Sequence, residues 1–342
     1  MTASSSPASS QDLADLDLPL DDAGRPHGLP DLVVPHAVLP FYLADAPVRG
    51  RLVRLGPLAE VILSRHSLPP AVLSLGAQAL ALVAAMATAL KFNGSFSLQI
   101  KGDGPVSLLV ADCTSEGVLR FTARMAENAP ETLPPSAAEL LGKGYLAFTV
   151  DQGPDTDRHQ GIAELKGETL AEMAEHYFAT SEQHACAIHL YACHEAENGW
   201  QAGALVLERI ANDGGVAQND DVPRTTRERD DSGEGEDLWE TACTFADTLT
   251  DKEIFDPALS GPALVHRLFG TLDVRVAPAR PLSFGCRCNR AKLANVLRNF
   301  SADDLDHMTQ DGIITMDCHF CNTHHHFRRS ALAAAQNGEG AQ

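Results

Sequence analysis

The chain has 342 residues, enough for two domains, and its hydrophobic share of 44% is ordinary for a globular protein. Its formal net charge of -20 argues against nucleic acid and anionic membranes as partners, because both require a basic surface. The N-terminus lacks the basic and apolar regions of a signal peptide, so we expect the protein to work in a reducing cytoplasm.

The first segment, residues 1–34, is rich in Ser, Ala, Asp and Pro and has no sustained hydrophobic periodicity. We expect a disordered tail there. Residues 35–210 contain several short strand patterns and a few helical ones. Phe96, Leu98 and Ile100, for example, alternate with polar residues as in a half-buried strand. The strands and helices do not form regular βαβ units. We therefore predict an α+β core domain with an antiparallel sheet.

The most apolar part of the chain is residues 73–90, within a helix predicted over 71–90 after Pro69 and Pro70. This stretch is rich in alanine, contains Ser74 and Gln78, and falls short of a comfortable bilayer span. We interpret it as a buried core helix.

Residues 211–237 are strongly acidic and almost without apolar side chains, which predicts a flexible insert. Apolar residues recur at helical spacing across 238–270, including Leu238, Phe245 and Leu268. We expect a helical linker there, which must bury its apolar stripe against a neighbouring domain.

Residues 271–329 contain two close cysteine pairs, Cys286 with Cys288 and Cys318 with Cys321. Four thiolates close a tetrahedral structural zinc site, and each spacing lets two sulfurs reach one ion. A module of this size cannot bury a self-sufficient core, so it needs such a staple. We predict a small C-terminal domain that binds one Zn²⁺ through these four residues, followed by a flexible tail at 330–342.

Two interpretations of this zinc site remain open from the residues alone. The site is a purely structural staple, or it is a redox switch, because thiolates are oxidisable and each pair is close enough to form a disulfide. Structural zinc supplies about 10–16 kcal/mol in small metallo-domains, so losing it should unfold the module. The other cysteines, Cys113, Cys186, Cys193 and Cys243, occur singly, and we interpret them as ordinary buried thiols.

A set of motifs runs from about 33 to 328: Val48-Arg49-Gly50, Leu90-Lys91-Phe92-Asn93-Gly94, Gln99-Ile100-Lys101-Gly102-Asp103-Gly104-Pro105, Tyr177-Phe178, Ser181-Glu182-Gln183, His266-Arg267-Leu268-Phe269, Phe284-Gly285-Cys286-Arg287-Cys288 and Asp317-Cys318-His319-Phe320-Cys321. Together these motifs resemble those of the 33 kDa heat-shock chaperonins, the redox-regulated bacterial holdases. The acidic insert and the N-terminal tail depart from the family pattern, and the insert leaves the limits of the linker open.

The resemblance implies an ATP-independent chaperone and not an enzyme. It implies that the reduced, zinc-bound form is inactive, and that oxidation forms the disulfides Cys286–Cys288 and Cys318–Cys321 and releases zinc. The linker would then unfold and expose apolar surface for unfolding client proteins, and the oxidised form would be a homodimer. Neither nucleic acid nor membrane is an expected partner. His324, His325 and His326 follow the second pair, and we expect them to be solvated or to line the core.

Other functions are weighed against this one. The Cys318/Cys321 motif is also found in thiol–disulfide oxidoreductases, but the βαβ context of those enzymes is missing here. A zinc-ribbon nucleic-acid binder would need a basic stripe, which residues 281–329 do not have. A zinc deaminase would need an HxE partner motif, which is also missing.

Overall fold

The computed structural model describes residues 15–16, 18–26, 28–89, 92–153, 158–210 and 234–336. The chain divides into two compact units. One unit is Asp31–Phe284, which we call the sheet unit. The other joins Met1–Pro30 to Gly285–Gln342, and we call its described part from Gly285 onward the cysteine module.

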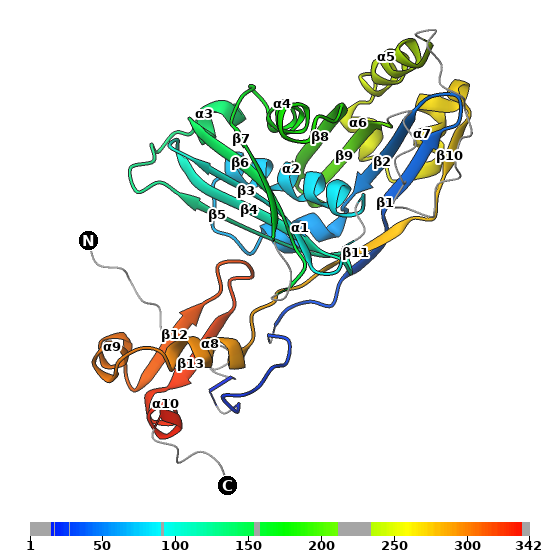
Figure 1. The fold of residues 1–342 in the computed structure, drawn as a ribbon. Coiled ribbons are helices and arrows are strands. Elements are labelled where there is room, and N and C mark those ends of the chain that lie inside the picture. Colours follow the sequence, from blue (N-terminus) through cyan, green and yellow to red (C-terminus); the bar gives the residue numbers. More distant parts are fainter. Residues whose placement is uncertain are drawn as a thin grey trace. The chain divides into compact units, whose positions relative to one another are not determined.

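The sheet unit is built on one sheet of eleven described strands, in the order β7-β6-β3-β4-β5-β11-β1-β2-β9-β8, with β10 also paired to β1 (Figure 1). Neighbouring strands are antiparallel except β5 and β11. The strands are β1 (Val33–Leu43), β2 (Val48–Arg54), β3 (Ser95–Gly102), β4 (Val106–Thr114), β5 (Val118–Met125), β6 (Gly144–Asp151), β7 (His159–Glu164), β8 (Cys186–Glu195), β9 (Gly199–Arg209), β10 (Val274–Val276) and β11 (Arg280–Phe284).

Helices pack on this sheet and complete an α+β fold. The predicted alternation in β3 is confirmed, because Phe96, Leu98 and Ile100 are buried. Helix α4 continues into a π-helical turn, Phe178–Glu182. The helices are α1 (Pro57–Leu63), α2 (Pro70–Ala87), α3 (Ala137–Leu141), α4 (Leu170–Tyr177), α5 (Glu234–Ala246), α6 (Asp251–Ile254) and α7 (Gly261–Phe269), and the sequence patterns did not predict α1.

Helix α2 is the apolar stretch that the sequence predicted as a core helix. By length and composition it is the one described helix that is apolar enough to cross a membrane, with a mean hydropathy of 1.8. However, 78% of it is buried inside the fold, and it contacts β9, β4, β8 and β5. Its hydrophobicity is therefore accounted for by packing against the sheet.

The linker helices α5, α6 and α7 bury their apolar stripe against β1, β2 and β9. The rings of Phe41 and Phe269 stack with centroids 5.3 Å apart. Because side chains alternate across a strand, Val53 and Val206 face the other side, where α2 contacts β2 and β9. The buried members of this linker cluster are Leu39, Phe41, Leu43, Ala46, Val48, Leu52, Leu205, Leu207, Ala242, Ala246, Leu249, Ile254, Leu264, Val265, Leu268, Phe269 and Leu272.

The structure differs from the predicted boundaries in three places. Strands β10 and β11 lie in the large sheet, although the sequence grouped them with the zinc domain over 271–329, and the division falls after Phe284. Within the expected disordered tail 1–34, Asp15 and other described residues contact the cysteine module, and β1 begins at Val33. The acidic insert lies largely outside the described residues, and α5 begins within it at Glu234.

The cysteine module contains α8 (Arg290–Leu297), α9 (Ala302–Met308), β12 (Ile313–Asp317), β13 (His324–Arg328) and α10 (Arg329–Gln336) (Figure 1). A capping box begins α9: Ser301 Oγ accepts the Asp304 amide, and the Asp304 carboxylate accepts the Ser301 amide. Its buried apolar residues are few, namely Ala294, Leu297, Leu305, Ile314, Phe327 and Leu332. A core this small supports the need for a staple.

Candidate metal centre

The first cysteine pair lies in the segment between β11 and α8. Asn289 caps α8 by accepting the Lys292 amide at 2.9 Å. The Lys292 ammonium in turn donates to the Arg287 carbonyl at 2.8 Å. These two bonds hold the backbone on both sides of Cys288, and so they orient the Cys286-Arg287-Cys288 segment.

The second pair occupies the turn between β12 and β13. The Cys318 amide donates to the Thr323 carbonyl at 3.0 Å, and the Asn322 amide donates to the Cys318 carbonyl at 2.7 Å. Asn322 has φ 49, a left-handed conformation that asparagine tolerates better than most residues. The motif thus lies in a hairpin turn, whereas a thiol–disulfide oxidoreductase carries its CxxC at a helix N-terminus.

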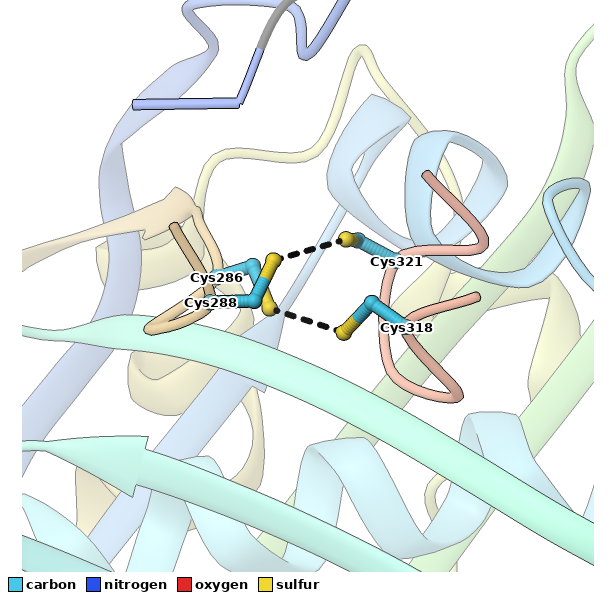
Figure 2. A group of neighbouring side chains, drawn as sticks. All are labelled: Cys286, Cys288, Cys318 and Cys321. Atoms are coloured by element: carbon cyan, nitrogen blue, oxygen red, sulfur yellow. Dashed lines mark hydrogen bonds between the residues drawn. The ribbon is translucent and has the colours of Figure 1, made fainter. Parts of the chain in front are cut away.

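The four sulfur atoms from these two segments come together, and all lie within 4.8 Å of one another. Figure 2 shows the two pairs facing each other across the site. The short distances run between the pairs: Cys286 Sγ is 3.6 Å from Cys318 Sγ, and Cys288 Sγ is 3.5 Å from Cys321 Sγ. The structure therefore brings together all four cysteines that the sequence singled out.

This arrangement fits a tetrahedral metal ion. Sulfurs about 2.3 Å from a zinc ion at the corners of a tetrahedron lie roughly 3.8 Å apart, close to the two contacts above. The donors are four soft thiols, Cys321 buried and the others half-buried, which is the set that structural zinc sites use. The four cysteines can therefore hold one metal ion.

Mutual hydrogen bonds shape the acidity of these thiols. The hydrogen bond from Cys288 lowers the pKa of Cys286, and that from Cys286 lowers the pKa of Cys318. The same network raises the pKa of Cys288 and Cys321. The sulfurs thus compete for protons when no cation is bound, and a cation that accepts all four would displace those protons.

The histidine tract forms β13, a strand that the sequence patterns did not predict. His324 is exposed, and its ring contacts Asp317 Oδ1 at 2.6 Å, whereas His325 and His326 are buried. None of the three belongs to the group of sulfur ligands. Their places agree with the expected solvated and core-lining roles.

A second group of metal-ligand residue types, His184, Cys186 and Glu208, also lies within 4.8 Å. Arg49 and Arg51 each donate to Glu208 Oε2 at 2.7 Å, so this carboxylate is already paired with two cations. Burial and the nearby Glu208 raise the pKa of Cys186, which keeps it a neutral thiol. We therefore interpret this group as an ion-pair cluster.

The remaining single cysteines differ from the sulfur site. Cys113 is buried as expected, while Cys186, Cys193 and Cys243 are half-buried. Burial raises the pKa of Cys113 to about 12 and that of Cys243 to about 11, and it also raises the pKa of Cys193. Protonated thiols are poor nucleophiles, so these cysteines are less oxidisable than thiolates held by a metal.

Comparisons with known proteins all point to one family. The family model described as Hsp33 protein matches residues 36–328. A 33 kDa chaperonin of Caulobacter vibrioides is 36% identical over 300 residues, covering 85% of this chain and 94% of that protein. One of Azotobacter vinelandii is 35% identical over 306 residues, covering 88% and 94%. The crystal structure of a Thermotoga maritima 33 kDa chaperonin superposes with TM-score 0.70 at 23% identity, covering 89% of this chain and 99% of that one.

Proposed function

The chain belongs to the Hsp33 family of chaperones, and from this premise we propose that it is a redox-regulated, ATP-independent holdase that protects unfolding proteins under oxidative stress. The observation that carries the redox part is the group of four cysteine sulfurs within 4.8 Å. As a chaperone the protein has unfolded proteins as partners. The control by zinc and disulfides is our proposal.

In the reduced state, Cys286, Cys288, Cys318 and Cys321 bind one Zn²⁺ per chain. Through these four thiolates a Zn²⁺ ion would tie the segment before α8 to the turn between β12 and β13. Structural zinc contributes about 10–16 kcal/mol in small metallo-domains, which exceeds what the small core of this module can supply. The reduced, metal-bound module is therefore folded, and the chaperone is inactive.

Oxidation removes the anchor. Each cysteine pair gives up two electrons and forms one disulfide, Cys286–Cys288 and Cys318–Cys321, while one peroxide molecule per pair takes up those electrons with two protons and becomes two water molecules. A disulfide sulfur no longer carries the thiolate charge that binds zinc, so the ion leaves. The short sulfur contacts between the pairs belong to the reduced state, and disulfide formation replaces them with one covalent bond inside each segment.

Loss of the module releases the linker helices. They cover one face of the sheet with apolar residues such as Phe41 and Leu207, and the linker contributes Leu264 and Phe269 to the same cluster. When α5–α7 unfold, that face and the linker's own apolar side chains become available to unfolding clients. Burial of apolar surface provides the binding energy without ATP.

We further propose that the oxidised form is a homodimer and that the protein acts in the cytoplasm. The net charge of -20 supports the absence of nucleic acid and anionic membranes among its partners. We propose no enzymatic activity, because the CxxC motif lies in the hairpin turn between β12 and β13.

One paired measurement tests the proposal. Reduced and peroxide-treated samples of the same preparation are assayed for bound zinc and for suppression of aggregation of a thermally unfolding client. We expect one zinc per chain and no suppression in the reduced sample, and released zinc with suppression in the oxidised one. Equal suppression by both forms would refute the switch, and catalytic reduction of insulin disulfides would favour an oxidoreductase.

A further inference from the structure

The described residues between Asp15 and Pro26, which we call the N-terminal strap, belong to the same compact unit as the cysteine module. They lie outside residues 36–328, where the family model matches. The strap contacts the module at the start of α8 and at β13. Both of these contact points are close in sequence to a cysteine pair. Its contacts are therefore a feature of this chain that the family match does not describe.

Asp15 is the first anchor of the strap. Its carboxylate accepts the His326 backbone amide at 2.9 Å and contacts the His326 ring nitrogen Nδ1 at 3.0 Å. It also pairs with the Arg290 guanidinium at 3.4 Å. The Asp15 side chain is only 12% exposed, and that of Arg290 only 4%. A buried charge of either sign needs its partner, so the two groups fix each other.

Arg290 joins three parts of this unit. Its Nε donates to the Leu18 carbonyl of the strap at 3.1 Å, and its Nη1 donates to the His326 carbonyl of β13 at 2.6 Å. The guanidinium also stacks over the Phe327 ring, 4.5 Å from its centroid. Arg290 is the first residue of α8, two positions after Cys288, so this side chain ties the start of α8 to β13 and to the strap.

Backbone and apolar contacts extend the docking. The Ala291 amide donates to the Asp22 carbonyl at 2.9 Å, and the Asn289 side chain donates to the Ala23 carbonyl at 3.3 Å. Leu20 packs against the small apolar core of the module. The strap thus supplies an acidic group, three carbonyls and one apolar side chain to a surface that offers a cation, donors and an apolar patch.

We propose that the cysteine module carries a docking surface whose occupant is this chain's own N-terminal strap. Docked, the strap clamps α8 to β13 without using any metal ligand. Asp15 and Arg290 connect the two chain segments that bear the cysteine pairs, so the clamp acts in parallel with the sulfur site. On the basis of the proposed function, the strap also slows opening of the module once zinc is lost, and so raises the oxidant exposure needed for activation.

Amide hydrogen exchange of the full-length reduced, zinc-supplemented protein tests the clamp. Asp15→Ala removes the charge anchor, and Leu20→Ala removes the apolar anchor without leaving a buried charge unpaired. We expect exchange in 289–298 and 324–328 to become about tenfold faster in Asp15→Ala, since hydrogen bonds to charged groups are lost. Leu20→Ala should give a smaller acceleration in the same two segments.

The matched control is Asp21→Ala, which removes the same charge from an exposed position of the strap. It should exchange like the parent, and β3 in the sheet unit should be unchanged in every variant. The proposal would be overturned if both Asp15→Ala and Leu20→Ala exchanged their amides at the parental rate in these segments. It would also be overturned if Asp21→Ala accelerated exchange as much as they do. Exchange does not depend on chaperone activity, so a failure of the redox switch would appear in the aggregation assay alone.

Discussion

A tetrahedral sulfur site depends on each of its four residues, because a zinc ion with one thiolate missing must take a weaker ligand. Cys286 and Cys318 form one short contact and Cys288 and Cys321 the other, so each pair along the chain contributes to both contacts. No sulfur is peripheral in this arrangement. Single substitutions should therefore disable the whole site.

For Cys288→Ser we expect loss of tight zinc binding, with the reduced variant partly active as a chaperone or unstable without oxidant. Zinc per chain, measured with a chelating dye after dialysis, checks this. Cys243→Ser is the matched control, because Cys243 is half-buried on α5 and lies outside the sulfur group. Full zinc affinity in Cys288→Ser would show that the ligand assignment is wrong.

Glu208 makes the free energy of unfolding depend on pH. Burial alone would raise its pKa, but Arg51 and Arg49 outweigh that effect and hold the pKa at about 2. An unfolded glutamate titrates near 4.3, so the folded state favours the ionised form by on the order of 3 kcal/mol. Because the folded pKa is depressed, this stability is fully present above the unfolded pKa and is lost as pH falls towards 2.

Glu208→Gln should therefore lower the free energy of unfolding most at pH 7. The difference between parent and variant should shrink as pH falls from about 4.5 towards 2, because the parent carboxylate is then protonated as well. Urea unfolding across this pH range measures it. Glu164→Gln, at an exposed position of β7, is the control. A difference that stays constant with pH would contradict the ion-pair explanation.

At the scale of elements, the linker is held to the sheet by side-chain packing rather than by its own helix propensity. Phe269 is fully buried at the end of α7 and stacks on Phe41 of β1. The Cβ of any residue larger than glycine at position 50 would lie 2.0 Å from the Phe41 ring, so β2 also approaches this ring closely. The linker and the sheet therefore share one tightly packed core.

We expect Phe269→Ala to loosen the linker, because truncating a buried phenylalanine costs about 3–5 kcal/mol. If unfolding of the linker is the step that activates the chaperone, the reduced variant should suppress client aggregation without oxidant while keeping its zinc. His266→Ala, on the exposed side of the same helix, should behave like the parent. Phe269→Ala that loses zinc and gains no chaperone activity would argue against the linker as the switch.

The capping box of α9 contributes to the local stability of the cysteine module. Ser301→Ala removes the side-chain acceptor for the Asp304 amide and should destabilise the module by about 1 kcal/mol. Amide exchange in 302–308 should increase while zinc per chain stays at the parental value. Unchanged exchange in α9 would show that the cap is not needed to hold the helix.

At the scale of the whole molecule, the two units differ in how much core they have. The sheet unit buries a large apolar core on both sides of its sheet, whereas the cysteine module buries six apolar residues. Folding free energy rises with buried area, so the units should differ in their dependence on metal. We expect the sheet unit to fold without metal, and the module to depend on the sulfur site and the strap.

Chelation of zinc under reducing conditions should therefore unfold the module first. We expect limited proteolysis to cleave within 285–336 while a fragment close to residues 31–284 stays intact. Restoring zinc before proteolysis should restore protection of the module. Protection of 285–336 that persists without metal would mean that the sulfur site is dispensable for folding.

Local patterns in the sequence anticipated much of this molecule. The alternation in β3, the core helix α2 and the two cysteine pairs depend on residues only a few positions apart. The spacing of the cysteines predicted the sulfur group because each pair can face one ion on its own. Periodicity in 238–270 showed that the linker must bury an apolar stripe, although not which surface receives it.

The sequence alone determined most of the helices and strands and the four sulfur residues, since neighbours along the chain specify them. Only the tertiary structure decided that β10 and β11 complete the large sheet, that the linker covers β1, β2 and β9, and that Asp15 pairs with Arg290. Those contacts join residues far apart in the chain. Their energy comes from complementary packing and paired buried charge, which no local pattern records.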